Sequence, residues 1–282
     1  MIHYGGVPEE YCKYDTSPIV VVPVAYDGTS TWGKGADQGP AALLEASANM
    51  ELYDIETDSE VYLKGIATAA ALEGFDTPEA MVKAVEQEVR KHLKADKFVV
   101  TLGGEHSVTI GAVYAHAAQF KDLTVLQLDA HTDLRQEYEG SKNNHACVMA
   151  RVAEKVPFVQ VGIRSMDVAE KAGVQQGRIF YAEHIHNQTN WIPRVLEQLS
   201  SKVYVTIDLD VFDPSIMPST GTPEPGGMYW YQVLELLKAV NETADIVGFD
   251  VVELSPKEGN RSPEFLAAKL VYKLLSYRFI SK

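Results

Sequence analysis

Three side chains that can donate ligand atoms to a metal ion, Asp129, His131 and Asp133, occupy alternate positions directly after an apolar run. The run, residues 125–128, is short and begins with a β-branched residue, which is typical of a buried strand. In an extended segment, alternate side chains point to one face and lie about 6–7 Å apart along the chain. The two carboxylates and the imidazole can therefore converge on one point, provided that the chain curls at Asp133.

The same kinds of side chain follow three other predicted strands. They are His106 after residues 98–102, Asp208 and Asp210 after residues 203–207, and Glu253 after residues 246–252. Each of them alone has an ordinary explanation, because a histidine after two glycines often begins a helix and Asp-x-Asp often opens a turn. Ligands of α/β proteins gather at the carboxyl ends of the strands, so the four sets together predict one shared site.

The predicted site contains four aspartates, which would repel one another strongly unless a cation neutralised them. One divalent ion would leave negative charge uncompensated, whereas two ions balance four carboxylates. A donor set rich in carboxylates and free of thiolates favours manganese over zinc or copper. Because two neighbouring ions can lower the pKa of a shared water toward neutrality, the pattern predicts a two-metal hydrolase.

The elements that must hold these side chains alternate between strand and helix along the whole chain. Further strands are predicted at residues 19–24, 61–67, 158–163 and 178–181. Helices are predicted at residues 41–48, 77–94, 108–118, 146–154, 191–199 and 229–240, with a short helix capped by Ser165 and a terminal helix opening at Asn260 or Ser262. Most strands are apolar on both faces, which predicts a parallel sheet covered by helices on both sides. We see no linker or repeat and expect a single domain, residues 1–282.

Composition sets limits on partners and location. The chain has 282 residues and a formal net charge of −14, which argues against nucleic acid as a partner and suits a small cationic substrate weakly. Cys12 and Cys147 are the two cysteines, so we expect no disulfide framework and a reducing compartment. We see neither an export signal nor an apolar run of membrane-spanning length. We therefore expect a cytoplasmic protein with no membrane partner.

Four motifs give the site residues in a recognisable order. They are Gly-Gly-Glu-His-Ser at residues 103–107, Asp-Ala-His-Thr-Asp at 129–133, Asp-Leu-Asp-Val-Phe-Asp-Pro at 208–214 and Asp-Val-Val-Glu at 250–253. In order and spacing they resemble the motifs of the ureohydrolases, the family of arginase and agmatinase. The resemblance implies a three-layer α/β/α fold with a central, mostly parallel sheet of about eight strands. It also implies two Mn²⁺ ions per chain and a homo-oligomer, either a trimer or a hexamer.

The resemblance also implies a role for each site residue. One manganese ion would be held by His106, Asp129, Asp133 and Asp208. The other would be held by Asp129, His131, Asp208 and Asp210, so that Asp129 and Asp208 bridge the two ions. Glu253 is similar to the carboxylate that receives the substrate guanidinium, which suits a planar fork of donors. His145, whose imidazole can exchange protons near neutral pH, is similar to the histidine that protonates the leaving amine, with Asp210 as a second candidate.

The segment after Asp133 indicates the substrate. Residues 133–140, which include Arg135, and residues 145–149 resemble agmatinase, in which this segment binds the substrate tail, so we count Arg135 and His145 among the substrate-binding residues. We therefore expect a small cationic guanidino substrate, with agmatine and water giving putrescine and urea. Residues 32–35 (Trp-Gly-Lys-Gly) and the pair Asn143-Asn144 depart from the common agmatinase pattern near the expected mouth of the site.

Three alternatives stay open on the sequence alone. A related ureohydrolase could act on guanidinobutyrate, arginine or a formimidoyl amino acid. A catalytically silent paralogue with a structural or regulatory role is disfavoured because all six ligand positions are filled. A single-zinc deacetylase on a similar fold would need only one metal site, which the six-ligand set and Glu253 argue against.

Overall fold

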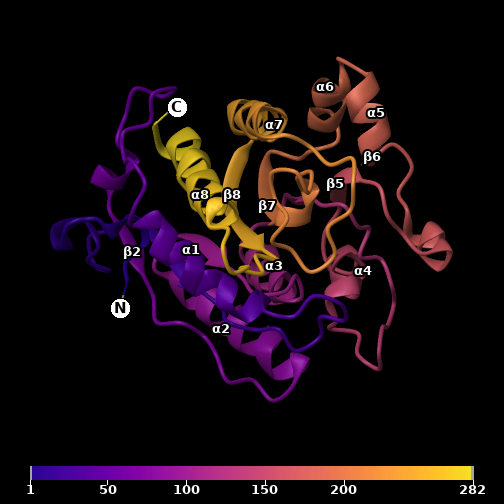
Figure 1. The fold of residues 1–282 in the computed structure, drawn as a ribbon, viewed down its shortest axis with the longest axis horizontal. Coiled ribbons are helices and arrows are strands. Elements are labelled where there is room, and N and C mark those ends of the chain that lie inside the picture. Colours follow the sequence, from indigo (N-terminus) through magenta and orange to yellow (C-terminus); the bar gives the residue numbers. More distant parts are fainter. Residues whose placement is uncertain (1, 281–282) are drawn as a thin grey trace.

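A computed structural model describes residues 2–280, and within that range the chain forms one eight-stranded sheet with helices on both sides (Figure 1). The strands are β1 (Ile19–Pro23), β2 (Ile66–Thr68), β3 (Phe98–Leu102), β4 (Leu123–Leu128), β5 (Phe158–Ile163), β6 (Ile179–Tyr181), β7 (Lys202–Asp208) and β8 (Asp245–Val252). The α-helices are α1 (Gly39–Ser47), α2 (Pro78–Lys94), α3 (Val108–Gln119), α4 (Val148–Ala153), α5 (Ala182–Asn187), α6 (Trp191–Leu196), α7 (Trp230–Thr243) and α8 (Ser262–Ile280).

The strands run parallel in the order β2-β1-β3-β8-β7-β4-β5-β6. The four strands that precede the predicted site residues, β3, β8, β7 and β4, are therefore immediate neighbours in the middle of the sheet. Adjacent strands lie about 4.8 Å apart, so their four carboxyl ends fall within the reach of side chains. This topology brings together residues that are up to about half the chain apart in sequence.

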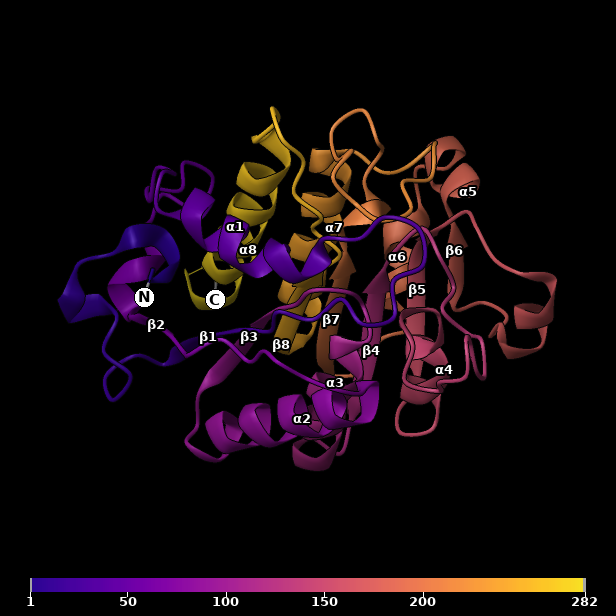
Figure 2. The ribbon, with the colours of Figure 1, turned by 60° about the horizontal axis from the view of Figure 1, so that its bottom comes forward.

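Helices cover both faces of the sheet, as Figure 2 shows, with α1, α7 and α8 on one side and α2, α3 and α4 on the other. Two clusters of buried side chains fill the spaces between the layers. One cluster takes its helical residues from α1, α5, α6, α7 and α8, and the other takes them from α2, α3 and α4. The predicted three-layer α/β/α fold with a parallel sheet is confirmed.

Two local predictions were wrong, and one helix was not predicted. The strand expected at residues 61–67 is a 3₁₀ helix, Val61–Lys64, followed by the three-residue strand β2. The short helix after β5 begins two residues later than expected, because the Asp167 carboxylate rather than the Ser165 hydroxyl accepts the N-terminal amide of Ala169. Helix α5 was not predicted, because it has only six residues and no capping side chain.

Tight packing at the end of β3 shapes the edge of the sheet where the site lies. A Cβ on Gly104 would lie 1.9 Å from the backbone oxygen of Tyr26, so only glycine fits between the ends of β1 and β3. The Gly104 carbonyl also accepts the backbone N–H of Glu253 at 2.7 Å. The two segments that supply His106 and Glu253 are thus joined directly through the backbone.

Among residues 2–280, none of the helices is both long enough and apolar enough to span a membrane.

Candidate metal centre and active site

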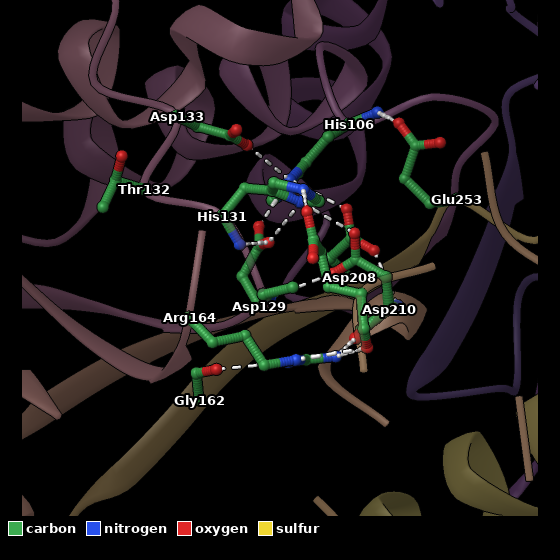
Figure 3. Close-up of polar contacts among 12 residues, drawn as sticks. His106, Asp129, His131, Thr132, Asp133, Gly162, Arg164, Asp208, Asp210 and Glu253 are labelled. Carbon is green, nitrogen blue, oxygen red and sulfur yellow. Dashed lines mark hydrogen bonds and ion pairs between the residues drawn. The ribbon is translucent and has the colours of Figure 1, made fainter. Parts of the chain in front are cut away.

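All six predicted metal ligands lie at the carboxyl ends of three of the four central strands, β3, β4 and β7, and their side chains point toward one another (Figure 3). The Nδ1 atom of His106 lies 3.1 Å from Asp129 Oδ2 and 3.0 Å from Asp133 Oδ2. It lies 3.4 Å from Asp208 Oδ2. One imidazole nitrogen is therefore surrounded by an oxygen from each of three carboxylates, which is the arrangement expected around a shared cation.

A second group surrounds His131. Its Nδ1 atom lies 2.8 Å from Asp210 Oδ2 and 3.6 Å from Asp129 Oδ1. Within the described residues, two sets of side chains bring ligand atoms within 4.8 Å of one another: His106, Asp129 and Asp208, and then Asp129, His131 and Asp210. Asp129 is common to both sets, as a bridging carboxylate must be.

The geometry matches the two predicted ligand sets closely, with a difference at Asp208. Asp133 joins the first group through its short distance to His106. Asp208 lies in the first group, but the second close set does not include it. Its predicted bridging role, like the ligand roles of the other five residues, stays a prediction.

Backbone amides fix the orientation of the carboxylates. Asp208 Oδ1 accepts the N–H of Asp210 at 2.8 Å, and Asp210 Oδ1 accepts the N–H of Ala130 at 3.0 Å. In each case one oxygen is held by the backbone and the other faces a histidine of the cluster. Asp129 is held more completely, because Oδ1 accepts the His131 N–H and Oδ2 accepts the side-chain amide of Gln127, both at 2.6 Å. Hydrogen bonds within the chain thus position the carboxylate oxygens.

Two of the site residues have a strained backbone. Asp133 has a φ of 50° and Glu253 a φ of 66°, in the left-handed region that non-glycine residues rarely adopt. The Asp133 carbonyl accepts the N–H groups of Met149 and Ala150, and these bonds hold the curl of the chain after β4. That curl turns Asp133 back toward His106, as the alternate spacing of the motif required.

The pKa values of the cluster show that negative charge is crowded in it. Burial raises the pKa of Asp133 to about 7, and the charge of Asp129 adds to the effect. Burial also raises the pKa of Asp208 well above its usual range, with contributions from Asp210 and Asp129. For His131, burial alone would lower the pKa, but the neighbouring carboxylates of Asp210 and Asp129 raise it to about 12. The site attracts positive charge, whether as protons or as metal ions.

The donor set fits divalent cations. His106 is buried, and its Nδ1 atom makes no hydrogen bond, although three carboxylate oxygens surround it. A buried polar atom with no hydrogen-bond partner is costly and calls for an explanation such as an ion. Carboxylates and imidazoles without a thiolate are the donors that suit manganese. Both close groups of ligands therefore fit a metal ion.

A cavity of about 310 Å³ lies over the cluster. His106, His131, Asp133, Asp208 and Asp210 face it from the metal side. The other predicted site residues that line it are Glu253, His145 and Arg135. The structure thus places all the predicted catalytic and substrate-binding residues on one cavity.

Glu253 is a buried carboxylate that has no cationic partner among the described side chains that contact it. Its Oε1 atom accepts the backbone N–H of His106 at 2.7 Å. Burial raises its pKa well above the usual range, and the nearby charge of Glu105 raises it further. A guanidinium ion in the cavity would compensate this carboxylate and lower its pKa.

His145 is hydrogen-bonded to the Thr29 hydroxyl, which is itself hydrogen-bonded to the carboxylate of Glu105. The Thr29 hydroxyl lies 3.2 Å from His145 Nδ1 and accepts the His145 backbone N–H at 3.0 Å. The same hydroxyl donates to the buried carboxylate of Glu105 at 2.7–2.8 Å. Because this hydroxyl has a single hydrogen, which goes to Glu105, it can only accept from Nδ1. Burial lowers the pKa of His145 to about 4, so the ring is neutral at neutral pH.

Arg135 lies on the cavity wall but is paired with acidic side chains. Its guanidinium lies 3.4 Å from the Asp167 carboxylate and 4.0 Å from the Glu170 carboxylate, and stacks 4.6 Å from the ring centre of Tyr138. A direct role in binding a cationic substrate does not follow from this geometry. Arg135 instead holds Asp167, whose side chain is 40% exposed on the cavity wall.

Several residues that support the metal ligands or line the cavity were not predicted from the sequence. Arg164, at the end of β5, donates to the backbone oxygens of Asp210 and Glu224 at 2.6 and 2.8 Å and so ties the metal loop to the rim of the cavity. A basic residue directly after a buried strand was the available signal for Arg164. Thr29 and Asp167 lie in loops, and nothing in their spacing indicated that they would reach the cavity.

A model of the Arginase family matches residues 17–276. The chain belongs to this family. It is a ureohydrolase, as the four motifs predicted, and the predicted resemblance is confirmed.

Relatives of this arginase-family chain include agmatinases and N(1)-aminopropylagmatine ureohydrolases. An N(1)-aminopropylagmatine ureohydrolase from a Synechocystis strain is 39% identical and aligns with 95% of this chain and 92% of its own. An agmatinase from Pyrococcus horikoshii is 33% identical, over 91% of this chain and 90% of its own. The crystal structure of the agmatine ureohydrolase of Thermoplasma volcanium superposes with a TM-score of 0.85 at 31% identity, covering 94% of this chain and 91% of that one.

Substituting either predicted bridging aspartate of this ureohydrolase should remove both ions. For Asp129→Ala and Asp208→Ala we expect less than one manganese per chain after dialysis, against two in the wild type, measured by elemental analysis. Circular dichroism checks that the variants fold, and Asp37→Ala, an exposed aspartate, serves as the matched control. Normal manganese content in either variant would show that the residue is not a bridge.

The metal-free protein should lose stability as the pH rises. The folded Asp133 carboxyl keeps its proton up to about pH 7, whereas the unfolded one loses it near pH 4. Because the folded pKa is the higher one, the free energy of unfolding falls between these two values. Denaturant unfolding of the metal-free wild type should therefore show a larger loss from pH 5 to pH 7.5 than that of Asp133→Asn. Equal losses would contradict the raised pKa.

Proposed function

We propose that this ureohydrolase uses two Mn²⁺ ions to hydrolyse agmatine to putrescine and urea. The observation that carries the proposal is the position of Glu253, an uncompensated carboxylate on the same cavity as two close groups of metal ligands. The agmatinase among the relatives and the agmatine ureohydrolase among the similar structures support the substrate. In this proposal His106, Asp129, Asp133 and Asp208 hold one ion, and His131 and Asp210 hold the other together with the two bridging aspartates.

Glu253 would position the substrate. A guanidinium ion stays protonated and presents a planar set of N–H donors, which a carboxylate accepts well. The bond from the His106 amide fixes Oε1, so the guanidinium is held at a set distance from the first metal group. Burial and the charge of Glu105 raise the pKa of Glu253, so a guanidinium would displace the proton and would then stabilise the charged carboxylate.

Asp210 and His145 would transfer protons during the reaction. When bound, the two ions would supply a nucleophilic water by lowering its pKa. Asp210, held through Oδ1 by the Ala130 amide, presents Oδ2 toward the cluster and can take a proton from the attacking water. His145 is neutral and keeps its hydrogen on Nδ1 against Thr29, so its bare Nε2 would first take up a proton released by the attacking water and then pass it to the departing amine.

A second candidate substrate differs from agmatine in its tail. The relative from Synechocystis, an N(1)-aminopropylagmatine ureohydrolase, shares 39% identity with this chain, against 33% for the agmatinase. Asp167 is a half-exposed carboxylate on the cavity wall, and it could receive an ammonium of either tail. The longer compound carries one more cationic nitrogen than agmatine. We therefore keep aminopropylagmatine as the second candidate substrate.

The working form is proposed to be a cytoplasmic homo-oligomer, either a trimer or a hexamer, with no nucleic acid or membrane partner. An apolar hollow on the surface supports self-association. Three large apolar residues, Trp230, Phe265 and Leu266, line it together with Arg261, Ser262 and Lys269. Exposed apolar surface of this kind is commonly covered by a protein partner.

Removing the charge of Glu253 should separate metal binding from turnover. Glu253→Gln should keep two manganese ions per chain yet lose at least about 100-fold in kcat/KM for agmatine, because the amide cannot compensate the guanidinium charge. Urea release and elemental analysis measure the two effects. Glu235→Gln, at an exposed position of α7, is the matched control and should stay within about twofold of the wild type. Unchanged activity of Glu253→Gln would refute the guanidinium role.

A panel of guanidino compounds tests the substrate. In manganese buffer we expect urea release from agmatine or aminopropylagmatine with a kcat/KM at least about 100-fold above that for arginine or guanidinobutyrate, since an acidic wall disfavours a carboxylate tail. Between the two candidates, the higher kcat/KM identifies the substrate. Release of urea from arginine alone would overturn both, and turnover of none would support a catalytically silent paralogue.

A further inference from the structure

Asp250 belongs to one of the four motifs, yet neither metal binding nor the proposed chemistry uses it. It is fully buried in β8, on the sheet behind the metal ligands. Its Oδ1 atom accepts the Thr206 hydroxyl at 2.7 Å, and its Oδ2 atom accepts the Tyr204 hydroxyl at 2.7 Å. The Thr206 hydroxyl oxygen in turn lies 2.9 Å from Nε2 of His106. A chain of hydrogen bonds therefore runs from Asp250 through Thr206 to His106.

The number of hydrogens in this chain fixes its direction. Both carboxylate oxygens of Asp250 already accept a hydroxyl, so Asp250 can only accept from Thr206. The Thr206 hydroxyl has a single hydrogen, and that hydrogen goes to Asp250. Its oxygen must therefore accept from His106, which requires a hydrogen on Nε2. An imidazole that binds a metal ion is neutral and carries one hydrogen, so Nδ1 is the nitrogen left free as a ligand.

Nδ1 is the atom that faces the first metal group. It lies 3.0–3.4 Å from oxygens of Asp129, Asp133 and Asp208 and has no hydrogen-bond partner. We propose that Asp250, acting through Thr206, is a positioning residue that holds His106 in the tautomer with Nδ1 free for the first metal ion. The inference rests on the proposed metal centre but not on the identity of the substrate.

Burial makes the arrangement rigid. Tyr204, Thr206 and His106 are each no more than 1% exposed, so water has little access to replace the bonds. The outer partners of a metal-binding histidine orient its ring and raise its basicity, and losing them typically weakens metal binding about 10- to 100-fold. Within the second metal group, His131 is 25% exposed and contacts the carboxylates of Asp210, Asp129 and Glu224. The effect should therefore fall on one ion of the pair.

The test measures manganese affinity by calorimetric titration of the metal-free, full-length protein. Thr206→Val keeps the shape of the side chain but removes the hydroxyl, and we expect the affinity for one ion to fall about 10- to 100-fold while the other stays within about threefold. Thr206→Ser, which keeps the hydroxyl, should recover wild-type affinity to within about threefold. Equal weakening of both ions, or failure of serine to restore binding, would overturn the proposal.

A double-mutant cycle tests whether Asp250 acts through Thr206. Asp250→Asn alone should weaken the same ion, but in the Thr206→Val background it should change the affinity by less than about twofold, because the connection is already broken. Fully additive losses would contradict the relay. None of these titrations contains a guanidine, so a substrate panel that showed no turnover would refute the proposed function and leave this result standing.

Discussion

The site is built on one constraint: the fold holds several carboxylates close together, although their charges repel one another. Asp129, Asp133, Asp208 and Asp210 meet at the ends of neighbouring strands, in a site that is almost fully buried. Two like charges 4 Å apart repel by roughly 4 kcal/mol even at an effective dielectric constant of about 20. The raised pKa values of Asp133 and Asp208 are the direct consequence of burial and of this crowding. Cations relieve the repulsion, so the architecture that creates it also specifies what binds.

Hydrogen bonds and backbone conformation hold the carboxylates in place against this repulsion. Backbone amides hold one oxygen of Asp208 and one of Asp210, and strained backbone at Asp133 and Glu253 aims their side chains inward. Glu253 stands slightly apart, bound to the same segment as His106 but not to a metal group. This separation lets one cavity provide a site for metal ions and a further negative charge for a cationic substrate.

The sequence predicted what repeats along the chain and missed what depends on long-range contacts. Apolar strands that end in acids indicated the sheet, its parallel direction and the six ligand candidates, because strand ends and ligand spacing are local properties. The 3₁₀ helix at Val61–Lys64 was mistaken for part of a strand, since a short apolar run has no clear period. Thr29 and Thr206 could not be recognised as partners of the histidines, because each meets its imidazole across at least 100 residues.

Anomalous diffraction from crystals grown with excess Mn²⁺ would show directly whether the crowded carboxylates bind a pair of cations. We expect two peaks in the site, roughly 3.5–4 Å apart, one beside Nδ1 of His106 and one beside Nδ1 of His131, with Asp129 between them. A single peak, or a cluster that keeps these positions with no manganese bound, would contradict this expectation.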